Sequence, residues 1–241
     1  MGTESRKVPA HGLRELADFP GVVALDGPSG TGKSTVARRL AERLGARYLD
    51  TGAMYRAATV AVLQAGVDPD DPDEVLRVVS GMDLQVSTDP GAQHTVLDGR
   101  GVDVEIRLPT TTRAVSAVSA IPRVREVLVE QQRLLIGNRP TVAEGRDVGS
   151  VVWPHADLKV YLTAREEVRA QRRAAETDSA NLADIARDLR RRDAFDSSRV
   201  TSPLRRADGA RVVDTSELSI DEVVEVLCRL AWDAVSAVDR G

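Results

Sequence analysis

The stretch that decides the fold is GPSGTGKS, residues 27–34. It matches the pattern GxxxxGK(S/T), in which a glycine-rich loop curls its backbone N–H groups around phosphate oxygens. An apolar run, GVVALD at 21–26, precedes the loop and is typical of a buried parallel strand. A helical pattern, KSTVARRLAERL at 33–44, follows it and ends at Gly45. Because a strand and a helix flank the loop in the required order, we predict a P-loop that binds the phosphates of a nucleotide.

The roles within this loop follow from its chemistry. Lys33 is expected to reach the β- and γ-phosphates of ATP, and Ser34 to ligate Mg²⁺ directly or through water. A GTP switch is not expected, because the DxxG-like match at 98–101 has no guanine-reading NKxD partner, and Val142-Ala143-Glu144 is only a truncated Walker B candidate. The predicted ATP-binding residues are Gly27, Pro28, Ser29, Gly30, Thr31, Gly32, Lys33, Ser34 and Thr35.

Alternating strand and helix patterns extend outward from the loop. Four further short apolar runs are predicted as strands, at 47–50, 140–145, 158–162 and 211–214. Helices are predicted between and after them, at 54–64, 74–82, 109–119, 122–137, 164–176, 179–193 and 220–237, the last capped by Ser219 with Glu222. Strands that alternate with helices indicate a parallel sheet covered on both faces.

The segment at about 84–106 departs from this alternation of strands and helices. Residues 84–86, 95–97 and 102–106 alternate with period two around the Asp98-Gly99 turn, which predicts a small antiparallel sheet. The predicted fold class is therefore α/β: a three-layer fold with a five-stranded parallel sheet and a small inserted antiparallel sheet. The core is placed at 20–66 and 107–241, and the insertion at about 67–106.

Composition restricts the class of protein further. The chain has 241 residues, 42% of them apolar, which is enough for a core, and no apolar run approaches the about 18 residues of a membrane span. Residues 1–19 are polar and aperiodic, so we expect a flexible extension, no secretory signal and a cytoplasmic location. The single cysteine, Cys228, lies in an apolar helical stretch and is predicted to be a core residue. A net charge of −4 argues against general nucleic-acid binding.

Two charged clusters follow predicted strands and indicate a second anion site. Asp50, Thr51 and Arg56 surround the start of the helix after the second strand, where an arginine could clamp an acceptor phosphate. Asp50 is equally suited to capping that helix. Arg146, in the EGRD cluster at 144–147, is expected to be a second phosphate clamp.

Five motifs in order resemble the bacterial cytidylate kinase family: DGPSGTGKST at 26–35, LDTGAMYR at 49–56, IPRVRE at 121–126, EGRDVGSVV at 144–152 and RRRDAFDSSR at 190–199. The resemblance runs from about Val22 to the C-terminus. It implies a P-loop kinase fold with a short helical lid at about 165–195, and transfer of the γ-phosphoryl group of ATP to CMP and dCMP in pyrimidine nucleotide metabolism, with Mg²⁺. The expectation of no nucleic-acid and no membrane partner comes from the charge and composition given above. The chain departs from the family pattern in its N-terminal extension, and at Thr51 and Glu144, where relatives can carry serine and aspartate.

The same resemblance implies individual roles. Ser116, Arg125 and Asp147 would read the cytosine ring, and Arg172 and Arg173 would belong to the lid over the triphosphate. The implied acceptor-binding residues are Asp50, Thr51, Arg56, Ser116, Arg125, Arg146, Asp147, Arg192, Asp196 and Arg199, and the implied catalytic residues are Lys33, Arg146, Arg172, Arg173 and Arg192.

Two alternatives stay open at this stage. A kinase for another small acceptor, such as UMP, dTMP or shikimate, would share the P-loop. A nucleotide-dependent regulatory protein with slow ATP hydrolysis would share it too. We expect a monomer, because the sequence contains no long heptad pattern and no broad exposed apolar stripe.

Overall fold

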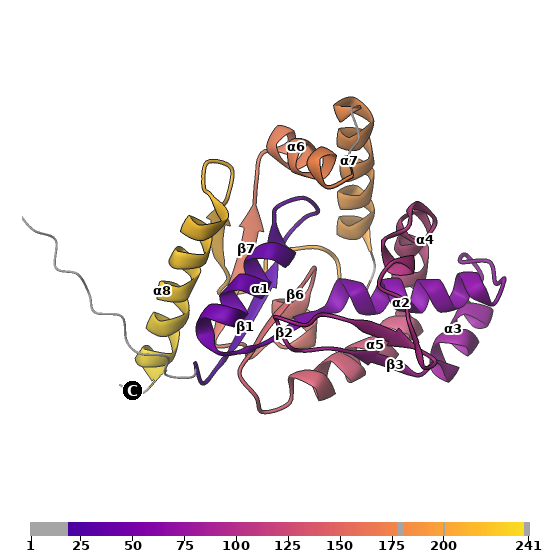
Figure 1. Ribbon diagram of the computed structural model, residues 1–241, viewed down its shortest axis with the longest axis horizontal. Coiled ribbons are helices and arrows are strands. Elements are labelled where there is room, and N and C mark those ends of the chain that lie inside the picture. Colours follow the sequence, from indigo (N-terminus) through magenta and orange to yellow (C-terminus); the bar gives the residue numbers. More distant parts are fainter. Residues whose placement is uncertain (1–18, 178–180, 200, 239–241) are drawn as a thin grey trace, which may run out of the picture.

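The computed structural model describes residues 19–177, 181–199 and 201–238, and its centre is a parallel sheet (Figure 1). The strand order is β2-β6-β1-β7-β8, and every neighbouring pair is parallel. Central β1 is buried along its whole length, which explains its uninterrupted apolar sequence. The bounds are β1 Val22–Asp26, β2 Arg47–Asp50, β6 Thr141–Gly145, β7 Leu158–Thr163 and β8 Arg211–Asp214.

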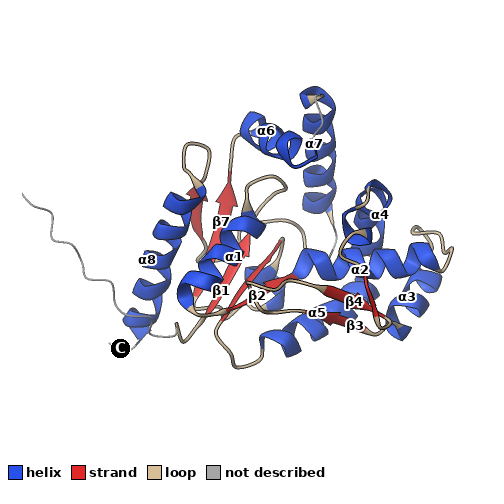
Figure 2. Cartoon of the chain, in the orientation of Figure 1, coloured by secondary structure: helices blue, strands red, loops and turns tan. Residues whose placement is uncertain are grey.

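Helices cover both faces of this sheet (Figure 2), so the predicted three layers are confirmed. On one face α1 (Lys33–Leu44) and α8 (Ile220–Val238) pack against the strands and against each other. On the other face α5 (Pro122–Ile136) packs with a π-helical turn at Val148–Val152. The predicted capping box at the start of α8 is present, since the Ser219 N–H and the Glu222 carboxylate lie 2.8 Å apart.

The small antiparallel sheet is present, in the order β3-β4-β5. It packs on α2 beside two further helices, α3 and α4. Helix α2 begins three residues before its predicted start, because the Asp50 side chain accepts a hydrogen bond of 2.9 Å from Ala53 N and caps it. The bounds are α2 Thr51–Gln64, α3 Pro72–Gly81, β3 Leu84–Val86, β4 Thr95–Leu97, β5 Arg100–Gly101 and α4 Pro109–Ala120.

The predicted strand at 102–106 is wrong. Strand β5 ends at Gly101, and a 3-10 helix at Glu105–Arg107 follows. Val102 and Ile106 are the buried pair at helical spacing, whereas Val104 between them is 72% exposed. The alternation of apolar residues here therefore reflects one helical turn with an exposed valine at its centre.

Two helices, α6 (Glu166–Thr177) and α7 (Leu182–Ser198), stand beside each other beyond the end of β7 (Figure 1). The prediction ended the second helix at 193, but it continues to Ser198 because no glycine or proline interrupts it. This extra length places Asp196 on a helix that also borders α4.

Phe19, which was predicted to belong to the N-terminal extension, is part of the packed core. Phe19 is fully buried, its N–H donates to Leu44 O, and its ring meets Trp232 edge-on with centroids 5.7 Å apart. The rest of the predicted extension, residues 1–18, lies outside the described residues. Cys228 is buried, as predicted.

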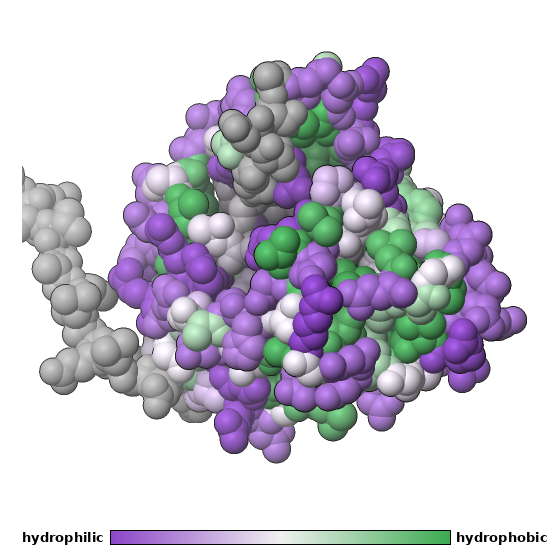
Figure 3. Space-filling model, turned by 45° about the vertical axis from the view of Figure 1, so that its right-hand side comes forward, coloured by the Kyte–Doolittle hydropathy of each residue, from purple (hydrophilic) through white to green (hydrophobic). Residues whose placement is uncertain are grey.

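The surface in Figure 3 is mostly hydrophilic, with smaller apolar patches among the polar side chains. None of the helices in the described part of the chain combines the length and apolar character needed to cross a bilayer.

Candidate active site

A cavity of about 600 Å³ opens at the carboxyl ends of β1, β2 and β6, where a parallel sheet with these crossovers presents ligands. It contains the P-loop at one end and residues of α2, α4, α5 and α7 at the other. The predicted site residues that line it are Ser29, Gly30, Gly32, Lys33, Ser34, Thr35, Asp50, Thr51, Arg56, Ser116, Arg125, Arg146, Asp147, Arg173, Arg192, Asp196 and Arg199.

The P-loop conformation depends on its glycines. Gly27 has φ 149°, and a Cβ there would lie 2.3 Å from Leu162 O, so no larger residue fits without a backbone shift. Lys33 is buried and donates a hydrogen bond of 2.8 Å to Pro28 O within the loop. Burial, together with nearby Arg146, lowers the pKa of this lysine to about 7. An anion in the loop would stabilise the charged ammonium and reverse this shift.

Asp26, directly before the loop, was not predicted as a site residue. Its two carboxylate oxygens accept hydrogen bonds of 2.8 Å from the backbone N–H groups of Val148 and Gly149. Burial raises its pKa to about 6. Asp26 therefore fixes the π-helical turn that follows Arg146 and Asp147 against the strand that carries the P-loop.

The far end of the cavity contains a buried ion pair. Arg125 Nη2 lies 2.5 Å from Asp147 Oδ2, and Arg125 Nη1 donates to Ser119 O at 3.1 Å. The Arg125 guanidinium lies 5.0 Å from the centroid of the Tyr55 ring, within cation–π range. Ser116 lines the same end of the cavity. Tyr55 and Ser119 were missed as site residues, although Tyr55 lies within the LDTGAMYR motif.

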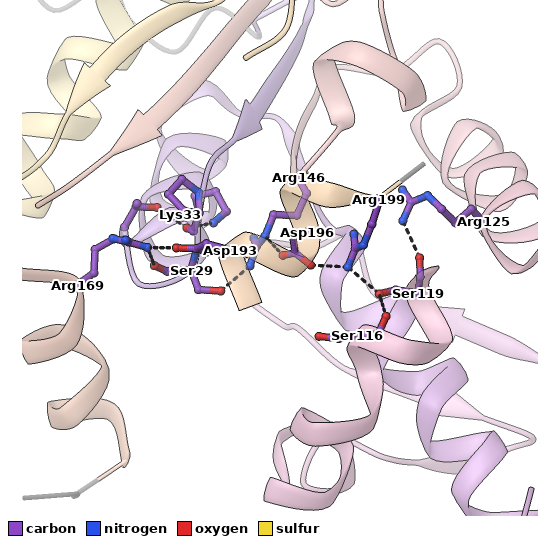
Figure 4. A network of polar contacts seen from close by, with 12 residues as sticks. Ser29, Lys33, Ser116, Ser119, Arg125, Arg146, Arg169, Asp193, Asp196 and Arg199 are labelled. Carbon is purple, nitrogen blue, oxygen red and sulfur yellow. Dashed lines mark hydrogen bonds and ion pairs between the residues drawn. The ribbon is translucent and has the colours of Figure 1, made fainter. Parts of the chain in front are cut away.

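Between the two ends lies a group of arginines, shown in part in Figure 4. Arg146 Nε contacts Asp196 Oδ2 at 3.0 Å, and its Nη2 donates to Ser29 Oγ at 2.7 Å. Arg56 is bound to Ile106 O and Thr112 Oγ1, both at 3.0 Å. Burial, with Arg146 beside it, lowers the pKa of Arg192 to about 10. Several cations in one cavity repel one another, so their arrangement favours binding of an anion.

Glu144, at the end of β6, faces the P-loop side of this cavity. Tyr48 donates a hydrogen bond of 2.6 Å to Glu144 Oε1, and burial raises the pKa of the carboxyl to about 7. The neighbouring oxygen donors are those of Ser34 and Asp50. Hydroxyl and carboxylate oxygens are the ligands that Mg²⁺ prefers, so the donor set fits this ion. The sequence signal for Glu144 was its position at the end of a buried strand.

Two predicted residues have other contacts here. Arg172 does not line the cavity: its guanidinium binds Thr31 O at 3.2 Å and both oxygens of Thr215, so it braces the outside of the P-loop. The hydroxyl of Thr51 donates to Glu144 O at 2.7 Å and is directed at backbone. Gly27, Pro28 and Thr31 form the P-loop without lining the cavity.

This architecture defines the class. A P-loop after the central strand of a parallel sheet, with an arginine-rich second pocket in the same cavity, is the arrangement of a P-loop phosphotransferase. The cytidylate kinase family profile matches residues 23–232. The chain belongs to the cytidylate kinase family.

Two relatives in sequence agree with this assignment. The chain is 53% identical to cytidylate kinase from Nocardia farcinica over 224 residues, covering 91% of this chain and 97% of the relative. It is 55% identical to cytidylate kinase from Rhodococcus opacus over 208 residues, covering 84% and 91%. Among solved structures, shikimate kinase from Acinetobacter baumannii has 16% identity and a TM-score of 0.43, with coverage of 90% and 95%.

Proposed function

We propose that the chain transfers the γ-phosphoryl group of ATP to CMP and dCMP, releasing ADP and CDP or dCDP. The observation that carries this proposal is one cavity with a P-loop at one end and the buried Arg125–Asp147 pair at the other. Family membership at about half identity over most of the chain supports the same activity. By the same reasoning we place the enzyme in pyrimidine nucleotide metabolism and in the cytoplasm, as a monomer that binds no nucleic acid.

The Arg125–Asp147 pair, at the end of the cavity far from the P-loop, is suited to binding a cytosine base. A cytosine edge offers the N4 amino donor beside the N3 and O2 acceptors. The Asp147 carboxylate can accept from the amino group, while Arg125 and the Ser116 hydroxyl can donate to the acceptors. Uracil reverses part of this edge and would leave buried polar groups unpaired, which costs affinity.

The arginines between the two ends are suited to the acceptor phosphate. Arg56 and Arg146 would grip it, with Arg192 and Arg199 beside them and Asp196 toward the ribose. An anion at this point would offset the burial that lowers the pKa of Arg56, Arg192 and Arg199. Acceptor binding therefore relieves repulsion that is built into the free protein.

At the donor end the P-loop backbone would cradle the triphosphate, and Lys33 would turn from Pro28 O to the β- and γ-phosphates. Ser34 would hold Mg²⁺, with Glu144 orienting its water ligands. When bound, Mg²⁺ neutralises phosphate charge and orients the triphosphate.

No general base is needed, because the second pKa of the acceptor phosphate is about 6 and the group is largely dianionic at neutral pH. Catalysis would rest on holding two anions in line and stabilising the transferring group with Lys33 and the arginines. We assign α6 and α7, with Arg173, to a lid whose closure excludes water and limits ATP hydrolysis.

The test is to follow radiolabel from γ-labelled ATP in the presence of Mg²⁺ and CMP. The expected result is label in CDP, with little free phosphate in the absence of CMP. Release of labelled phosphate at an equal rate with and without CMP would contradict the proposal and favour a regulatory ATPase.

A further inference from the structure

Helix α7 carries two carboxylates, Asp193 and Asp196, that lie one turn apart and contact opposite ends of the site. Asp193 faces the P-loop, and Asp196 faces the arginines of the acceptor end (Figure 4). Both belong to a helix that otherwise carries exposed ion pairs, such as Arg191 with Asp188, whose side chains are 71% and 69% exposed. The two inward carboxylates are therefore distinct from the solvated charges of the same helix.

Asp193 connects the lid to the P-loop. Its Oδ1 accepts a hydrogen bond of 3.3 Å from Ser29 N, and its Oδ2 pairs with Arg169 of α6. Arg169 in turn donates to Ser29 O at 3.1 Å. Both side chains are largely buried, at 11% and 18% exposed, so this contact is weakly screened by solvent. One P-loop residue is thus held through both of its backbone polar groups by the two lid helices.

Asp196 connects the same helix to the acceptor end. Its two oxygens pair with Arg146 and Arg199, and Arg199 Nη2 also donates to Ser119 Oγ of α4 at 2.9 Å. The Asp196 side chain is only 7% exposed. A shift of α7 along its axis would therefore move two of the proposed phosphate and ribose contacts together.

These contacts close into a ring at Ser29. Arg146 Nη2 donates to Ser29 Oγ at 2.7 Å, so Ser29, Asp193, Asp196 and Arg146 are linked in sequence with α7 as one side. These charge-assisted contacts are partly buried, and they connect Ser29 of the P-loop to Arg146 of the proposed acceptor clamp both directly and through α7.

We infer that Asp193 is a positioning residue that couples donor binding to acceptor binding. Donor phosphates order the P-loop, Asp193 fixes α7 to the ordered loop, and Asp196 then presents Arg146 and Arg199 to the acceptor. The inference rests on the proposed function, because it takes ATP and CMP as the two ligands. Coupling of this kind typically changes affinity by about 5- to 150-fold, reciprocally for the two ligands.

The test is calorimetric titration of CMP into the full chain, with and without saturating Mg²⁺ and the non-hydrolysable ATP analogue AMP-PNP. In the parent we expect the analogue to tighten CMP binding by about fivefold or more. In Asp193→Asn the ratio should fall to below about twofold, while the CMP affinity without analogue stays within about twofold of the parent. Asp188→Asn, on the exposed face of α7, is the matched control and should keep the parent ratio.

Ser29→Ala is the second variant, because it opens the ring at Arg146 without changing charge, and it should also lower the ratio between the CMP affinities with and without the analogue. Thermal melting checks that each variant is folded. A parent ratio retained in both variants, or CMP binding in Asp193→Asn weakened equally with and without analogue, would overturn the inference. Failure of the parent to bind CMP at all would instead overturn the proposed function.

Discussion

Arg125 and Asp147 form an ion pair of 2.5 Å in which the two side chains are only 3% and 6% exposed. A pair this deeply buried is not retained for stability alone, because desolvation offsets most of its Coulomb energy. Both residues line the cavity, and this position is the basis of the proposed role, in which a fixed carboxylate and a fixed guanidinium would face a base together. Substitutions of Arg125 and Asp147 are therefore expected to have strongly non-additive effects on stability.

Replacement of Arg125 by Met should be costly in two respects. It leaves the Asp147 carboxylate buried without a counter-ion, which should lower the free energy of unfolding by about 3–5 kcal/mol, and it should raise the KM for CMP. Adding Asp147→Asn should recover much of the stability without recovering CMP binding. Urea unfolding and initial rates measure the two effects. Arg123→Met, which removes an exposed pair on the same helix, should cost less than about 1 kcal/mol.

Replacement of Lys33 by Met keeps the aliphatic stem and removes the ammonium. We expect kcat to fall by about a hundred- to a thousandfold, as for loss of one preorganised donor, with the melting temperature little changed. Lys159→Met is the control, since that lysine binds Asp208 O away from the cavity. Near-parental turnover in Lys33→Met would remove this lysine from the mechanism.

Glu144 makes stability depend on pH in the ligand-free protein. Burial, followed by the charge of Asp50, raises its pKa from 4.5 to about 7, so ionisation costs more in the folded than in the unfolded state. Its contribution is therefore most favourable below pH 4.5 and is lost as pH rises to about 7. The expected loss is about 3 kcal/mol, because the pKa moves from 4.5 to about 7 and each pH unit corresponds to about 1.4 kcal/mol.

Glu144→Gln should remove this slope while keeping an oxygen for the Tyr48 hydrogen bond. The measurement is urea unfolding of both proteins at several pH values between 4.5 and 8. The difference between the two proteins is the informative quantity, because Asp26, with its own raised pKa, contributes equally to both. Parallel curves would show that Glu144 titrates normally.

The boundary of the domain can be tested at Phe19. Phe19→Ala empties a fully buried site against Trp232 and should lower the free energy of unfolding by about 3–5 kcal/mol. Leu134→Ala, at a side chain that is 77% exposed, should change it by less than about 0.5 kcal/mol. Equal effects would place Phe19 outside the cooperative unit.

Much of the fold follows from short-range patterns. The P-loop motif predicted a strand before it and a helix after it, and both are present. The capping box of Ser219 and Glu222 predicted the start of α8. Where the prediction was wrong, a tertiary contact determined the observed structure. Val102 and Ile106 were assigned to a strand by alternation, but packing against α2 selects their helical spacing. Phe19 was assigned to a tail because its partner, Trp232, is more than two hundred residues away in sequence.

In the candidate site, too, some residues could be predicted from sequence motifs and others are determined by tertiary contacts. Motif residues that follow different strands, such as Arg56 after β2 and Arg146 after β6, could be placed in one site from sequence, since the carboxyl ends of parallel strands lie at one edge of the sheet. Asp193 lies within the RRRDAFDSSR motif, but no role was assigned to it from sequence. Only the three-dimensional structure shows that it faces the P-loop, whereas Asp188 of the same helix is exposed. Arg172 was predicted from the family resemblance to belong to the lid over the triphosphate, but its side chain binds Thr215.

The central claim is that the cavity selects a nucleoside monophosphate with a cytosine base, CMP or dCMP, as phosphoryl acceptor. The most direct measurement is kcat/KM for ADP formation from MgATP with CMP, dCMP, UMP, dTMP and AMP in turn, and shikimate and a no-acceptor reaction as controls. The account predicts that CMP and dCMP exceed every other acceptor, and that Asp147→Asn narrows the gap between CMP and UMP. Equal rates with UMP or AMP, or a rate independent of acceptor, would contradict it.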